Sequence, residues 1–138
     1  SKFMGYCGNM CRPFVLGPVP KEVRKLMDAA LEATEYALST IRAGKKASEL
    51  FRGYYDILAK YGCEEFTLYG PAHGTGYSEV EGLWLSRDAD FVIKPNMLFN
   101  IDVWLSDGSC GLRYEEGVLT TGDGLRELNN YRREIISL

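Results

Sequence analysis

The sequence has little of several features that would direct it to particular classes of protein. No apolar run approaches the roughly 20 residues of a membrane-spanning helix, and the N-terminus lacks the basic-then-apolar layout of a signal peptide. There is also no basic excess, since 16 Lys and Arg residues stand against 19 Asp and Glu residues for a net charge of -3. Proteins that bind nucleic acids or anionic membranes usually do so through a basic face. We therefore expect a cytoplasmic protein with neither a membrane nor a nucleic-acid partner.

Cysteine is scarce as well. The four cysteines stand at positions 7, 11, 63 and 110, and their spacings match neither a zinc ribbon nor a thioredoxin-like pair. Without a secretory signal, reduced thiols are the expected state. The chain has no internal repeat, and 138 residues are enough for one domain with its own core. Residues 1–138 are therefore predicted to form a single domain.

Apolar periodicity places two helices between extended segments. Residues 1–16 read as strands or a hairpin, and residues 21–43 and 47–61 carry apolar residues at the three- and four-residue steps of helices. After Gly62 the pattern predicts strands over 66–69, 91–93, 97–105 and 110–121, with a hairpin turn at 107–108.

The only histidine, His73, lies in a glycine-rich stretch, residues 68–84, which we expect to be a loop. Glycines gather where the backbone must approach a neighbour closely or adopt positive φ. Histidine is the commonest metal ligand and the usual proton-transfer group near neutral pH. The alternative is an exposed loop histidine with no function.

Two carboxylates accompany His73 on the predicted strands. Strand alternation puts Asp102 on the face opposite the aliphatic residues of 97–105, and it puts Glu115 on one face with Arg113. A carboxylate among buried neighbours is costly unless it is paired or bound to metal. Two carboxylates and one imidazole suit manganese, cobalt, iron or zinc. A simple ion pair of Arg113 with either carboxylate would satisfy the same charges.

The order of these motifs resembles the prolidase, aminopeptidase P, methionine aminopeptidase and creatinase superfamily. The similarity runs from Gly-Tyr-Cys-Gly-Asn-Met-Cys-Arg-Pro-Phe at 5–14, through His-Gly-Thr-Gly at 73–76, to Gly-Leu-Arg-Tyr-Glu-Glu-Gly at 111–117. It implies an α+β pita-bread fold, a curved antiparallel sheet with helices on its outer face. It also implies that the N-terminal part of that domain lies upstream of Ser1.

Family peptidases hold two metal ions with two aspartates, a histidine and two glutamates. By this resemblance, His73 and Glu115 match family ligands, and the shorter Asp102 stands in place of a glutamate. Asn9 stands where the second aspartate belongs, and the first aspartate would precede Ser1. The implied ligand set is therefore His73, Asp102, Glu115 and Asn9, holding one divalent metal or none.

The resemblance also assigns residues around the substrate. Val80 stands in place of a second histidine that helps to bind substrate, and Glu81 matches the acidic residue after it. We expect His73 and Glu81 to be catalytic, and Arg113, Val80 and Tyr77 to contact the substrate.

Three functional interpretations remain open at this point. The first is a hydrolase acting on a peptide or a small C–N substrate, with a degraded or mononuclear metal site. The second is a catalytically inactive relative that binds a peptide or a partner, which Asn9 and Val80 favour. The third is a piece of a longer protein whose upstream part supplies the missing aspartate, leaving a sheet edge that favours a homodimer or an N-terminal partner domain.

Overall fold

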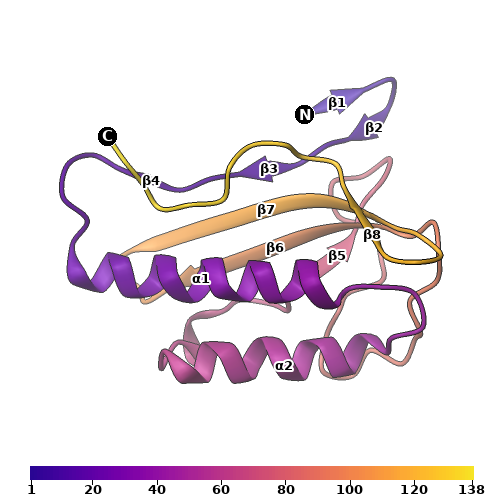
Figure 1. Ribbon diagram of the computed structural model, residues 1–138, viewed down its shortest axis with the longest axis horizontal. Helices are drawn as coiled ribbons and strands as arrows, with labels where there is room; N and C mark the ends of the chain where they lie inside the picture. Colours follow the sequence, from indigo (N-terminus) through magenta and orange to yellow (C-terminus); the bar gives the residue numbers. More distant parts are fainter.

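Two long antiparallel strands, β6 (Leu98–Ser106) and β7 (Gly111–Thr120), form the centre of the computed structural model, which describes residues 1–138 (Figure 1). They belong to a sheet with the order β3-β7-β6-β5, in which β8 also pairs with β7. The remaining strands of this sheet are β3 (Met10–Cys11), β5 (Ala72–Gly74) and β8 (Leu125–Glu127). These antiparallel pairings agree with the α+β class predicted from the sequence.

Strict alternation divides β6 and β7 into an inner and an outer face. On β6 the four residues Phe99, Ile101, Val103 and Leu105 are all fully buried in the hydrophobic core. Their partners on β7 share this inner face, because residues directly opposite each other on paired strands point to the same side. Asp102 and Glu115 are such a pair on the outer face, as the alternation predicted.

The core is completed by two helices, α1 (Lys21–Thr40) and α2 (Ala47–Lys60). Helix α1 packs on β6 and β7, and α2 packs on α1, so both lie on the inner side of the sheet (Figure 1). The one polar residue of the α1 apolar stripe, Thr34, is buried with its hydroxyl donating to the carbonyl of Ala30 at 2.8 Å. Neither helix combines the length and the apolar character that crossing a membrane requires.

The N-terminal segment runs along the edge of β7 remote from α1 (Figure 1). Strands β1 (Lys2–Phe3) and β2 (Tyr6–Cys7) form the hairpin expected there, and β3 then pairs with β7. Further on, β4 (Phe14–Val15) pairs in parallel with β9 (Ile136–Ser137). The two ends of the chain are thereby joined through their strands.

Two short predicted strands do not form. Residues 64–66 form a 3₁₀ helix (Glu64–Phe66), in which the Phe66 amide bonds locally to the Cys63 carbonyl, and the 91–93 segment makes only an isolated bridge between Val92 and Lys46. Phe66, Phe91 and Ile93 pack in or against the core, whereas Leu68 and Val92 are exposed. Apolar composition alone does not distinguish such a segment from a strand.

The packing of α2 leads to a test of stability. Leu58 is fully buried, so Leu58→Ala should lower the free energy of unfolding by about 2–5 kcal/mol through lost burial and a residual cavity. Leu68 is 69% exposed, and Leu68→Ala should change it by no more than about 0.5 kcal/mol. Urea unfolding followed by circular dichroism measures both. Equal losses in the two variants would contradict the packing described here.

Candidate functional site

A cross-strand pair of carboxylates lies at the centre of the candidate site. Asp102 of β6 and Glu115 of β7 are directly opposite each other on the outer face, and their side chains are only 4% and 10% exposed. Like charges in this relation repel each other. The pair therefore requires a compensating positive charge or proton nearby.

Arg113 supplies that positive charge. Its Nε lies 3.0 Å from Asp102 Oδ1 and its Nη1 lies 3.3 Å from Glu115 Oε1. The contact with Asp102 is one of charge rather than an aligned hydrogen bond, since neither of those two atoms has a hydrogen-bond partner. The ion pair considered from the sequence is thus present, and it reaches both carboxylates.

Tyr69 completes the network around Asp102. Its hydroxyl donates to Asp102 Oδ2 at 2.7 Å and accepts a hydrogen bond from Arg113 Nη2 at 2.5 Å. Burial, with the hydrogen bond to Asp102, raises the pKa of Tyr69 to about 12, so the phenol keeps its proton. Asp102 is consequently held from both of its oxygens.

His73 lies on β5, and not in a loop as the glycine content suggested. It stands opposite Asn100 of β6, and its Nε2 lies 3.6 Å from Asp102 Oδ2. The glycines are required because other backbone segments pass very close to them. A Cβ on Gly74 would lie 2.4 Å from the Gly82 carbonyl oxygen, and a Cβ on Gly70 would lie 2.1 Å from the Leu85 carbonyl oxygen. The stretch after His73 can therefore fold back on β5, and the Trp84 ring lies 5.1 Å from the imidazole, centroid to centroid.

Several groups act on the charge of His73. Burial lowers its pKa, but the Asp102 carboxylate, the Gly74 carbonyl 2.9 Å from Nδ1 and the charge of Glu115 together raise it above the ordinary value. The Gly74 carbonyl can only accept, so Nδ1 carries a proton. Nε2 faces the Asp102 carboxylate, so the ring takes up a second proton more readily than a free imidazole does, whereas the Asn100 Nδ2 at 3.5 Å can donate only to a deprotonated Nε2.

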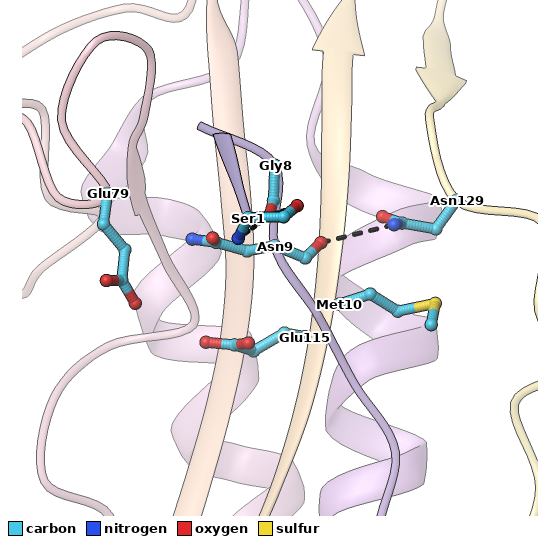
Figure 2. Close-up of a pocket in the computed structure, with 7 residues that line it drawn as sticks. All are labelled: Ser1, Gly8, Asn9, Met10, Glu79, Glu115 and Asn129. Atoms are coloured by element: carbon cyan, nitrogen blue, oxygen red, sulfur yellow. Dashed lines mark hydrogen bonds between the residues drawn. The ribbon is translucent and has the colours of Figure 1, made fainter. Parts of the chain in front are cut away.

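A pocket of about 580 Å³ opens between the N-terminal segment and β7 (Figure 2). The Glu115 carboxylate points into it below Asn9, and Glu79 reaches toward it from the loop after β5. Burial, followed by the charge of Asp102, raises the pKa of Glu115, although Arg113 opposes this. A carboxylate with a raised pKa facing a pocket is a group suited to proton transfer.

The other residues predicted for the site are distributed differently. Asn9 lines the pocket, and its backbone carbonyl accepts a hydrogen bond from Asn129 Nδ2 (Figure 2). Glu81 instead turns back on its own loop and accepts a hydrogen bond from the Ser78 amide. Tyr77 is exposed and stacks on Tyr6, and Val80 is exposed. The structure therefore brings His73, Asp102, Glu115, Arg113 and Asn9 together, while Glu81, Tyr77 and Val80 lie on the loop beside them.

Sequence reasoning missed four residues of this region. Asn100 could have been found, because it shares the outer face of β6 with Asp102 by alternation. Tyr69, Glu79 and Asn129 carry no such signal, since each reaches the site from an irregular segment. Their places depend on the path of loops that periodicity does not describe.

Comparison with known proteins assigns the fold to a family. Residues 1–122 match the model of metallopeptidase family M24. The chain belongs to this family. The prolidase of Thermococcus sibiricus superposes with a TM-score of 0.94 at 29% identity, covering 100% of this chain and 38% of that chain. The pita-bread fold inferred from the motifs is thereby confirmed.

Relatives in sequence include proteins with different activities in their names. The probable dipeptidase PepE of Mycobacterium tuberculosis is 29% identical over 133 residues, covering 96% of this chain and 36% of its own length. An agropine synthesis cyclase of Rhizobium rhizogenes is 28% identical, covering 94% and 33%. The chain thus spans about a third of the length of these relatives. It belongs to a family whose relatives include peptidases and at least one protein named for a cyclisation.

The single histidine allows a direct titration test. Because the folded-state pKa of His73 is raised above 6.5, its interactions stabilise the fold fully below that value, and the stabilisation is lost as pH rises through the folded-state pKa. The one histidine Cε1–H signal in a proton NMR titration should show a midpoint above 6.5. Asp102→Asn should shift it downward, because the carboxylate is removed. A midpoint below 6.5 in the unaltered protein would contradict the charge state described above.

Proposed function

We propose that this chain carries the site of a hydrolase that cleaves the C–N bond of a peptide or a small molecule without a paired-metal centre. One observation supports it above the others: the buried Glu115 carboxylate faces a pocket, while its neighbour Asp102 is turned to Arg113 and Tyr69. A peptidase-type activity fits the PepE relative and the Thermococcus prolidase.

The proposal excludes two metals because the residues of the site do not suit them. Paired ions about 3.5–4 Å apart need several carboxylates to hold their charges together. Here Asn9 offers a neutral amide, and the Arg113 cation contacts both Asp102 and Glu115. No three His, Cys, Asp or Glu side chains come together closely enough to hold an ion. The guanidinium takes the charge-compensating place that a metal would fill.

In the proposed reaction Glu115 is the general base. Its carboxylate takes a proton from a water molecule in the pocket, and the oxygen of that water attacks the carbon of the scissile bond. The C–N bond then breaks, and the leaving nitrogen receives the proton that Glu115 took from the water. His73 is the second acid–base group, placed one layer behind the pocket beside Asp102 and Asn100. Glu81, Tyr77 and Val80 would contact substrate from the adjoining loop.

The alternative is a peptide-binding module without turnover. Asn9 and Val80 favour it, because each replaces a residue type that family peptidases use in catalysis. Such a module would keep the pocket beside Glu115 and lose only the chemistry.

The proposal predicts the effect of removing the base. Glu115→Gln should lower turnover of an Xaa-Pro dipeptide by about 100-fold or more, since an amide cannot accept the proton. His73→Ala should also abolish turnover while the fold is retained, as judged by circular dichroism. The matched control is Glu134→Gln at an exposed position, which should keep full activity.

Metal removal distinguishes hydrolysis without any metal, which we expect because Arg113 already compensates the charge of Asp102 and Glu115, from hydrolysis with one bound metal. Dialysis against EDTA should leave turnover unchanged, and elemental analysis should find no stoichiometric manganese, iron, cobalt or zinc. Activity that is lost with chelator and restored by metal would refute the metal-free reaction. Dipeptide binding without any cleavage would instead favour the binding module.

A further inference from the structure

A second, smaller cavity of about 130 Å³ adjoins the Glu115 pocket. The two share Gly8, Asn9 and Asn129 in their walls. The space is several times the roughly 30 Å³ that one water molecule takes up in the liquid. No Lys, Arg, Asp, Glu or His side chain lines it. A group that enters the cavity therefore meets an uncharged polar wall.

The cavity exists because position 117 is a glycine. Gly117 pairs with Asn100 across β6 and β7, so any side chain there would point to the outer face. A Cβ on Gly117 would lie 3.3 Å from Asn129 Oδ1 and 3.7 Å from the Leu128 side chain. These contacts show that even one methyl group would begin to fill this space.

Two polar side chains on the wall already have their partners. Asn129 accepts the Gly117 amide proton with its Oδ1 at 2.5 Å and donates from its Nδ2 to the Asn9 carbonyl at 3.3 Å. The Thr75 hydroxyl donates to the Ser78 carbonyl at 3.3 Å. Each polar side-chain atom of Asn129 and Thr75 therefore already has at least one protein partner.

Two other wall groups are left open. Asn100 is fully buried, with its Nδ2 beside His73 Nε2 and toward Glu115, and its Oδ1 accepts no hydrogen bond. The Nδ2 of Asn9 is also buried and donates none. Buried polar atoms nearly always have a protein, water or ligand partner, so an unpaired acceptor and an unpaired donor on one cavity wall mark a place for a complementary polar group.

We propose that the small cavity is a subsite for a neutral primary amide. The amide NH₂ would donate to Asn100 Oδ1, and the amide carbonyl would accept from Asn9 Nδ2. A carboxylate has no proton for Asn100 Oδ1, and an ammonium group has no acceptor for Asn9 Nδ2. Either charge would also be desolvated without a counter-charge on the wall. The claim that this amide belongs to a substrate rests on the proposed function. The claim that the cavity binds a primary amide does not.

The test is a titration of the 138-residue chain with three probes of similar size: acetamide, acetate and methylammonium. Two-dimensional NMR should show saturable shifts at Gly117 and at the Asn100 side-chain amide with acetamide. So small a ligand should bind with a Kd on the order of millimolar. Acetate and methylammonium should bind at least tenfold more weakly. Equal, weak responses to all three would mean that the cavity holds only water, and would overturn the proposal.

Variants assign the effect to the two asparagines. Asn100→Leu should abolish the acetamide response, and the exposed Asn130→Leu should preserve it. If Asn100→Leu does not fold, Asn9→Asp at the partly exposed position still decides, because replacing the donor with a carboxylate should reverse the preference toward methylammonium. An acetamide affinity unchanged by Asn9→Asp would contradict the proposal.

The outcomes separate this subsite from the proposed hydrolysis. Acetamide selectivity in a chain that hydrolyses no dipeptide would leave the subsite standing and remove the hydrolase. Turnover of an Xaa-Pro dipeptide without acetamide selectivity would do the reverse.

Discussion

The ion pair between Arg113 and two buried carboxylates is the interaction on which the rest of the site depends. Asp102 and Glu115 lie opposite each other on neighbouring strands, where their charges would repel. One guanidinium within 3.0 Å of the first and 3.3 Å of the second permits both to stay in the sheet. Because Arg113 and Glu115 are two residues apart on β7, strand alternation alone puts them on the same face.

The remaining contacts follow from how this cluster is enclosed. Tyr69 and His73 approach Asp102 from one side. The residues that follow them, Gly70 and Gly74, have no side chain, so the chain after β5 can pass close to their backbone. On the other side Glu115 stays open to the pocket under the N-terminal segment. One carboxylate is therefore locked and the other is accessible. That asymmetry is the physical basis for assigning proton transfer to Glu115.

The sequence predicted the parts of the fold that depend on regular periodicity. Helices α1 and α2 and the faces of β6 and β7 agree with their apolar patterns, and helix α1 ends three residues before the predicted position 43. The strand at His73 was missed because three residues, two of them alanine and glycine, carry no alternating pattern. Family resemblance located His73, Asp102 and Glu115, and the structure brings them together. The clamp of Tyr69 on Asp102 was not predictable, since it depends on the path of an irregular segment.

A double-mutant cycle between Arg113 and Asp102 tests the central claim most directly. Unfolding free energies would be measured for the unaltered protein, Arg113→Met, Asp102→Asn and the double variant. If Arg113 compensates the buried charge, Arg113→Met should lower the free energy of unfolding less in the Asp102→Asn background than in the unaltered protein. The expected coupling is about 1–3 kcal/mol. Additive losses, within about 0.5 kcal/mol, would show that the guanidinium does not hold this site together.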